Sequence, residues 1–155
     1  MNRSLFASAL AVLALLWSAA LISAQQFGTA EEAREMLNRA IAALKSNEAT
    51  ALSEFNDSND NRFHDRDLYV FCYGMSDGKI TAYSSPALIG IDVRTLMLKD
   101  EPIGQRAYDA IQNSLEGSVA TVDYNFPKPG TTEPIPKQYI ETRVGNQGCG
   151  VAYYK

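Results

Sequence analysis

The sequence predicts an α+β fold, in which a few helices pack on an antiparallel sheet of five strands. Three observations support this prediction. Apolar residues recur at helical spacing in only a few segments, most other ordered segments have the composition of strands, and these strands are interrupted once by helices. Regular alternation of strand and helix would instead have indicated a parallel sheet. The length of 155 residues is that of one domain.

Residues 1–24 have the layout of a secretory signal peptide. Arg3 is their only charged residue, an apolar stretch begins at Leu5, and small residues up to Ala24 form a cleavage site. We expect cleavage, which places residues 25–155 in the periplasm or outside the cell. The alternative is an uncleaved membrane anchor, since the apolar stretch is long enough to span a bilayer.

Two helices are expected at the start of the folded region. Thr29 and Glu32 form a capping box, in which each side chain accepts a hydrogen bond from the other residue's backbone. Apolar residues then recur every three or four positions, which predicts a first helix over about 30–45. A second, shorter helix is expected over 48–55, ended by the polar cluster 56–61.

A hairpin follows the helices. Residues 68–73, LYVFCY, are apolar on both faces and predict a central strand. Asp77 and Gly78 form a strong turn signal, and 79–83 is the expected returning strand.

A helical excursion is expected between the second and third strands. Asp92 can cap a short helical turn over 93–98. A longer helix is expected over 105–116, with Leu115 on its apolar side and Gly117 as its stop signal.

Three further strands complete the expected sheet, over 118–126, 137–144 and 149–154. Residues 127–136 contain four prolines and a glycine, which predicts a long exposed loop. Residues 146–148 are the expected turn before the last strand.

Composition excludes several functions. The chain has 14 basic and 18 acidic residues and no basic run, which argues against binding to nucleic acid or to an anionic membrane surface. Two cysteines and one histidine are too few for most zinc sites. No phosphate-binding glycine motif is present, so we expect no nucleotide and no other cofactor.

Six motifs, in their order along the chain, resemble the Cache family of PAS-like extracellular sensor domains, in its second single-Cache variant. They are DLYVFC (67–72), DGK (77–79), PALIG (86–90), VDY (122–124) after Gly117, PK (136–137) and CGVAYY (149–154). The resemblance covers about residues 29–154, nearly all of the single Cache domain expected over 25–155.

The resemblance implies a sensor module that binds a small organic anion, such as a short carboxylate, without catalysis. Such modules usually sit in membrane receptors and histidine kinases. This chain ends at Lys155, directly after the last expected strand, so we expect a stand-alone secreted module whose partner is a membrane receptor or a histidine kinase.

The resemblance also implies that the first and last strands are neighbours, which would bring Cys72 and Cys149 together. In an oxidising compartment this favours a disulfide. Two buried free thiols are the alternative, because neighbouring strands often do not meet the geometry that a disulfide requires.

Four residues are the expected ligand contacts. An anion in an apolar cavity needs a cation and hydrogen-bond donors. Lys137 would supply the cation, and Tyr83, Tyr124 and Tyr139 would supply hydroxyl groups. The resemblance supports Tyr124 and Lys137, whereas Tyr83 and Tyr139 depend on their expected positions. The alternative for each tyrosine is ordinary packing in the sheet, with its hydroxyl group in water.

Two other functions stay open. In one, the protein is an envelope interaction module without a small ligand, or a homodimer through its first helix. In the other it is an enzyme, for which His64 is the only candidate base near neutral pH. Residues 64–67, HDRD, are expected to form a charged corner and not a metal site, because no second segment supplies donors.

Overall fold

The computed structural model describes residues 26–155, so the expected signal peptide over 1–24 lies outside the described residues. No helix within that range is long and apolar enough to cross a membrane. The elements, in chain order, are α1 (Ala30–Ser46), α2 (Glu48–Phe55), β1 (His64–Asp65), β2 (Leu68–Gly74), β3 (Ile80–Ala82), the short 3-10 helices η1 (Pro86–Leu88) and η2 (Val93–Thr95), α3 (Ile103–Gln112), β4 (Val119–Pro127), β5 (Pro134–Val144) and β6 (Gln147–Tyr154).

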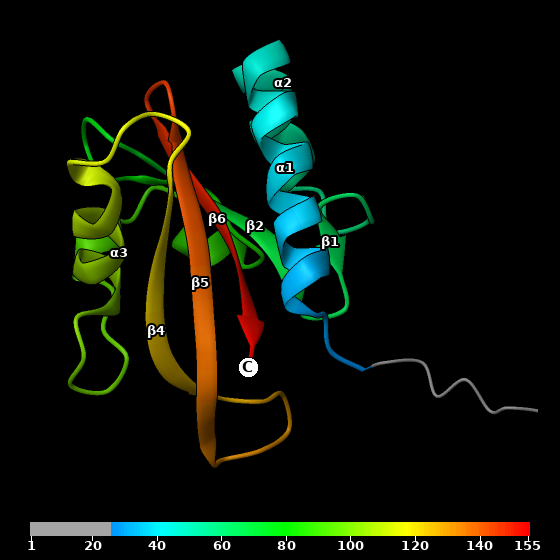
Figure 1. Ribbon diagram of the computed structural model, residues 1–155, viewed down its shortest axis with the longest axis vertical. Helices are drawn as coiled ribbons and strands as arrows, with labels where there is room; N and C mark the ends of the chain where they lie inside the picture. The colour runs from blue at the N-terminus through cyan, green and yellow to red at the C-terminus, as the bar shows by residue number, and fades with distance from the viewer. Residues whose placement is uncertain (1–25) are drawn as a thin grey trace, which may run out of the picture.

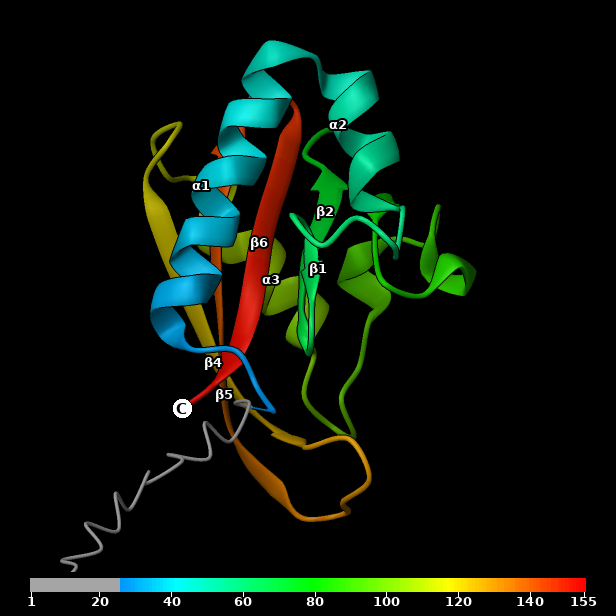
Figure 2. The same cartoon turned by 90° about the vertical axis from the view of Figure 1, so that its right-hand side faces the viewer.

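The sheet separates two helical layers. Its strands follow the order β1-β2-β6-β5-β4, with β3 also paired to β2, and every pairing is antiparallel. Helix α1 covers one face and α3 covers the other (Figure 1). After a quarter turn, α1 lies in front of β6 and α2 lies in front of β2 (Figure 2). The predicted α+β architecture is confirmed, and the structure adds the two-residue strand β1.

The helix starts agree with the sequence. The Thr29 hydroxyl accepts a hydrogen bond from Glu32 N at 3.1 Å, and Thr29 N donates to the Glu32 carboxylate at 2.7 Å, which is the predicted capping box. Asn47 caps α2 by accepting from Thr50 N at 2.9 Å. Both predicted helices therefore begin where their caps are placed.

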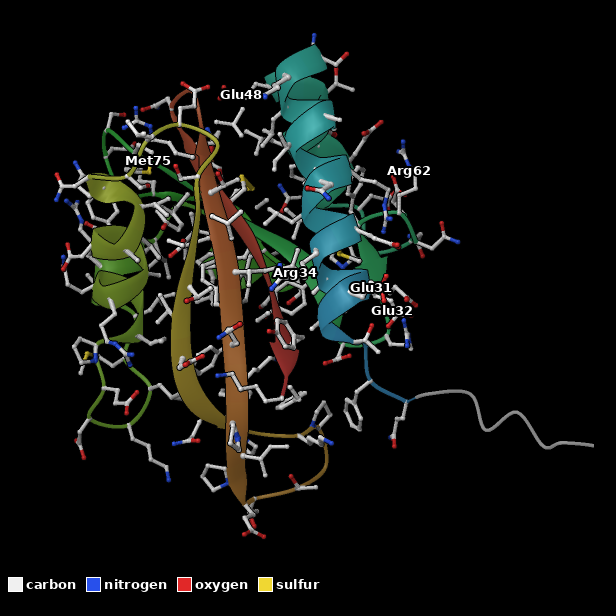
Figure 3. The ribbon with its side chains drawn as sticks, in the orientation of Figure 1. Glu31, Glu32, Arg34, Glu48, Arg62 and Met75 are labelled. Atoms are coloured by element: carbon white, nitrogen blue, oxygen red, sulfur yellow. A yellow bond between two sulfur atoms is a disulfide. The ribbon has the colours of Figure 1, made fainter. Side chains whose placement is uncertain are left out.

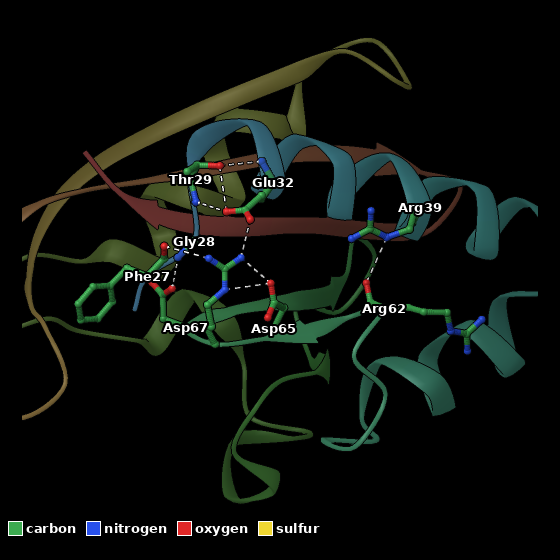
Figure 4. A network of polar contacts seen from close by, with 9 residues as sticks. Phe27, Gly28, Thr29, Glu32, Arg39, Arg62, Asp65 and Asp67 are labelled. Atoms are coloured by element: carbon green, nitrogen blue, oxygen red, sulfur yellow. Dashed lines mark hydrogen bonds and ion pairs between the residues drawn. The ribbon is translucent and has the colours of Figure 1, made fainter. Parts of the chain in front are cut away.

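The charged corner at 64–67 ties the start of α1 to the sheet. Arg66 turns the chain with a φ of 56° and donates to Glu32 at 2.7 Å and to the Phe27 carbonyl at 3.2 Å (Figure 4). Its guanidinium group is the main reason that the pKa of Glu32 falls to about 2. Asp67 accepts from Gly28 N at 2.6 Å. This network joins the corner, which the sequence predicted to be charged, to the chain that leads into α1.

The α1 face of the sheet carries the larger core. Side chains fill the space between the sheet and the helices on both sides (Figure 3). On the α1 side, Leu37 and Phe55 pack against Val70 and Val151, all at most 2% exposed. Cys72 and Cys149 pair directly across β2 and β6 and form a disulfide within this core.

Helix α3 differs from the prediction at both ends. It spans Ile103–Gln112, because the Ser114 hydroxyl and backbone N–H both bond to the Ile111 carbonyl and end it. Gly117 is not its stop: with a φ of +81° it lies in the turn from Leu115 to Ser118 that leads into β4. Leu115, predicted on the apolar side, is 81% exposed.

The predicted loop over 127–136 is also shorter than expected, since β4 and β5 stay paired as far as Pro127 and Pro134. The Pro136 carbonyl accepts from Lys155 N, so the Pro136 nitrogen points to the same side, just past the end of β6. Proline is compatible with the strand at this position, because the regular pairing with β6 ends at Lys137 and Tyr154. The last turn is Gly145-Asn146, one residue earlier than predicted, and Gly145 has a φ of +58°.

Candidate functional site

A cavity of about 230 Å³ lies between the sheet and the excursion, on the face away from α1. Its floor consists of strand side chains, and its other walls come from the excursion and from α3. The lining residues are Tyr69, Phe71, Tyr83, Leu88, Leu96, Met97, Leu98, Ile103, Gly104, Ala107, Tyr124, Phe126, Lys137, Tyr139 and Ala152. All four predicted ligand residues are among them.

Cross-strand pairing explains why three of the four meet. In one row, Lys137 on β5 pairs with Tyr124 on β4 and with Tyr154 on β6. In the next row on the same face, Tyr139 pairs with Ala152. Residues two apart along a strand share a face, so Lys137 and Tyr139 point to the same side. Tyr83 follows the end of β3 and reaches the cavity from there.

Lys137 is the cation of the cavity. The residue is 6% exposed, and its Nζ lies 4.4 Å from the centre of the Tyr154 ring and 5.6 Å from that of Phe126. It makes no hydrogen bond or ion pair with any described residue. Burial lowers the pKa of Lys137, and the nearby Asp67 carboxylate partly opposes this. Asp67 Oδ2 is also buried without a hydrogen-bond partner among the described residues.

The three tyrosines differ in how their hydroxyl groups are bound. Tyr139 donates to the Phe71 carbonyl at 3.3 Å, and Tyr83 accepts from Tyr69 at 3.3 Å. The Tyr124 hydroxyl has no hydrogen bond to a described residue. Burial raises the pKa of Tyr124 and of Tyr139, so both phenols are protonated donors at neutral pH.

The sequence did not single out the remaining walls. Tyr69 and Phe71 line the cavity, whereas Tyr73, on the same face of β2, is fully buried beyond it. Leu96 and Ile103 from the excursion and α3 close the other side. The alternation along β2 shows which side chains share a face of the sheet. It does not show which of them are covered by α3 and which face the cavity.

Close packing holds the excursion against α3. Arg94 bonds to Asp92 at 2.8 Å and to the Asp77 carbonyl at 3.0 Å, and its guanidinium group lies 5.1 Å from the centre of the Tyr108 ring. A side chain at Gly104 would place its Cβ 1.7 Å from a backbone oxygen of η2. The glycine therefore permits the contact that forms this wall.

His64 is bound away from the cavity. Its Nε2 lies 2.7 Å from the Phe55 carbonyl, and its ring stacks on Tyr69 at 6.3 Å. Both cysteines are in the disulfide, so neither is a thiol nucleophile. Within residues 26–155, no group of three or more histidine, cysteine or acidic side chains could hold a metal ion.

Glu141 is a buried carboxyl group that the sequence analysis did not identify. It lies two residues beyond Tyr139 on the same face of β5 and is 0% exposed. The Tyr73 hydroxyl donates to its Oε2 at 2.6 Å, and its Oε1 has no hydrogen-bond partner among the described residues. Burial raises the pKa of Glu141 to about 8. A glutamate in an alternating strand gives no signal of burial, so only the fold shows it.

No protein-family model and no curated protein matches the chain. Solved structures do match its fold. A periplasmic sensor domain of a chemotaxis protein is 20% identical, with a TM-score of 0.55 over 80% of this chain and 88% of that one. A Cache chemosensory domain, described for its recognition of carboxylic acids, is 17% identical, with a TM-score of 0.60 over 80% and 91%.

A methyl-accepting chemotaxis protein from Vibrio parahaemolyticus is 19% identical, with a TM-score of 0.60 over 80% of this chain and 86% of that one. At these identities the likeness concerns the fold. The fold is therefore that of Cache-like sensor domains, built from an N-terminal helix and an antiparallel sheet. The chain is structurally similar to the periplasmic chemosensory domains of chemotaxis proteins.

Proposed function

We propose that the protein is an extracytoplasmic sensor module whose cavity binds a short organic carboxylate, without turnover. Acetate, propionate, pyruvate and lactate represent the class. The observation that carries the proposal is the buried ammonium group of Lys137, which faces an apolar cavity without an ion pair to a described residue. A buried cation of this kind favours an anionic partner, because a charge removed from water is costly until it is paired.

The size and polarity of the cavity support a small ligand. Its volume of about 230 Å³ is below the about 300–1,000 Å³ of sites for drug-sized molecules. Its walls are mainly aromatic and aliphatic, with Lys137 and the hydroxyl groups of Tyr83, Tyr124 and Tyr139 as the predicted polar contacts. We propose that Lys137 and the Tyr124 hydroxyl bind the carboxylate group directly, while Tyr83 and Tyr139 orient it.

The comparisons support the same class of ligand. One structure of similar fold is described for carboxylic acid recognition, and another is a periplasmic sensor domain. By this analogy we also propose the single-Cache assignment, removal of residues 1–24 as a signal peptide, and a membrane receptor or histidine kinase as the partner. Ligand binding would order the excursion against the sheet, and the partner would read that change.

A thermal-shift screen of the protein against short mono- and dicarboxylates tests the proposal. A ligand at 100 times its dissociation constant stabilises the fold by about 2.7 kcal/mol, a shift of several degrees. Lys137→Met should abolish that shift. Lys128→Met is the matched control, because Lys128 also lies over the Tyr154 ring, at 5.6 Å, but does not line the cavity.

The alternative outcomes are distinct. A shift that survives in Lys137→Met would overturn the proposed contact. No shift with any carboxylate would favour the interaction module without a ligand, which includes a homodimer through α1. Apart from Ala42, the exposed residues of α1 are polar or charged, among them Glu31, Arg34, Glu35 and Asn38, so such a dimer would depend on charge pairing and weaken in salt.

A further inference from the structure

The cavity has a second titratable group behind its wall. Tyr139 lines the cavity, and the next residue on the same face of β5 is Glu141, about 7 Å further along the strand. Glu141 is fully buried and does not line the cavity itself. Its Oε2 accepts from Tyr73, and its Oε1 is buried without a partner among the described residues.

The charged and titratable groups around Glu141 do not supply a counter-charge. Burial raises the pKa of Tyr73 from β2 and of Tyr139 from β5, so both are neutral phenols, and Tyr108 from α3 packs on Tyr73. The facing positions on β4 and β6 are Ala120 and Gly150.

Two cations share the face of β5. Arg143, two residues further on, has no ion pair with Glu141 among the described contacts, and its Nε is itself unpartnered. Lys137 lies beyond Tyr139, at the cavity. A carboxyl group in these surroundings is favoured in its neutral form, because the hydrogen bond from Tyr73 replaces only part of the water that an ionised group would lose.

We propose that Glu141 keeps a proton behind the ligand cavity, and that binding of an anion in the cavity is coupled to that proton, so that affinity for carboxylates falls as Glu141 ionises. This inference rests on the proposed function. A bound carboxylate and an ionised Glu141 would be like charges separated by roughly one aromatic side chain, in surroundings that screen them weakly. The ligand is therefore bound more tightly by the protonated form, and by linkage it draws a proton onto Glu141.

Burial raises the pKa of Glu141 to about 8, so the effect belongs to weakly alkaline solution. Below about pH 7 the proton is already present, and the affinity should not depend on Glu141. Near pH 8 binding should take up about half a proton at this group, and above it the affinity should fall. Loss of the Lys137 proton also weakens anion binding at high pH, so the test must isolate the contribution of Glu141.

Titration calorimetry with propionate, in buffers of different ionisation enthalpy, measures the protons taken up on binding. Comparing variants then separates the contribution of Glu141 from that of Lys137. Glu141→Gln keeps the shape and removes the titration, whereas Lys137 still titrates. We expect wild-type protein at pH 8 to take up about half a proton more per propionate than Glu141→Gln. Between pH 7 and pH 9 its affinity should fall about tenfold more than that of the variant. Glu133→Gln, at an exposed carboxylate, is the matched control and should behave as wild type.

A second variant and a second measurement keep the inference testable if Glu141→Gln folds poorly. Tyr73→Phe removes the hydrogen bond that favours the ionised form, so it should move the affinity loss to higher pH. Infrared spectroscopy of the ligand-free protein at pH 7 should show the C=O stretch of a protonated carboxyl group, which Glu141→Gln lacks.

Absence of that band in wild-type protein overturns the inference whatever the ligand. Equal proton uptake by wild-type protein and Glu141→Gln overturns the coupling but leaves the proposed function intact. If propionate and the other short carboxylates do not bind at all, the proposed function fails and the coupling fails with it, whereas the infrared band still decides whether Glu141 holds a proton.

Discussion

The two faces of the sheet differ in what they bury. On the α1 face, apolar side chains form one continuous core around the Cys72–Cys149 disulfide. On the α3 face the apolar residues fall into two smaller clusters, and the cavity lies beside them with the buried polar residues Lys137 and Glu141. The first face is packed for stability, whereas the second leaves space and buries the two ionisable side chains Lys137 and Glu141.

Strand β5 shows how one segment serves both purposes. Ile140 and Val144 point into the α1 core, whereas Tyr139 and Glu141, at the alternate positions of the strand, point to the α3 side. Alternation along the strand makes this division possible, because neighbouring side chains face opposite layers. Substitutions on the two faces should therefore separate stability from ligand binding.

The largest expected effect is on the α1 face. Replacing Cys72 and Cys149 together with alanine opens a loop of 77 residues and should lower the free energy of unfolding by about 4 kcal/mol. Thermal unfolding followed by circular dichroism should show a midpoint lower by about 10 °C or more. Below that midpoint, propionate affinity should stay unchanged, and a loss of affinity in the folded variant would contradict the division between the faces.

A pair of apolar truncations gives the next largest contrast. Leu37 is 2% exposed in the α1 core, so Leu37→Ala should cost about 3 kcal/mol through lost burial and a cavity. Met97 lines the ligand cavity and is 56% exposed, so Met97→Ala should change stability by less than about 0.5 kcal/mol. Urea denaturation measures both, and similar costs would show that the excursion is as tightly packed as the core.

The sequence predicted the α1 face better than the α3 face. Local signals, such as the capping box at Thr29 and the Asp77-Gly78 turn, determine where the helices and the first hairpin begin. The resemblance predicted that Tyr124 and Lys137 would lie at one site, and they are direct cross-strand partners. Their contact with a ligand stays a prediction.

The errors occur where tertiary contacts decide the outcome. Leu115 continues the apolar period of α3, but the helix ends before it, since Ser114 and Gly117 are hydrogen-bonded to other groups. Glu141 gives no sign of burial in the sequence, because the residues that surround it come from β2 and α3. A single sequence shows the hydrophobic periodicity of each segment, but it does not show which residues from other segments will pack against it.

The pH dependence of stability tests the α3 face directly. The pKa of Glu141 is raised to about 8 in the folded protein from an ordinary value of 4.5, so the folded state binds more protons than the unfolded state between these limits. Stability should therefore fall as the pH rises from about 4.5 to about 8, and then level off. Urea denaturation should show this fall in wild-type protein and in Glu133→Gln, but not in Glu141→Gln. The same fall in Glu141→Gln would assign it to other groups.

The smallest expected effect on stability is that of Tyr124→Phe, a variant that should nevertheless weaken ligand binding. Tyr124 lines the cavity and its hydroxyl has no hydrogen bond to a described residue, so Tyr124→Phe should change stability by less than about 0.5 kcal/mol. It should nevertheless weaken propionate binding up to about tenfold, because one donor to the carboxylate is lost.

Tyr153→Phe is the matched control from the α1 face. There the hydroxyl donates to Gln138 at 2.6 Å, so its loss should cost about 1 kcal/mol of stability and leave propionate binding unchanged. Calorimetry and urea denaturation of the two variants should thus give opposite results. If Tyr153→Phe weakened binding as much as Tyr124→Phe does, the two faces would be coupled through the strands, and ligand binding would draw on the whole sheet.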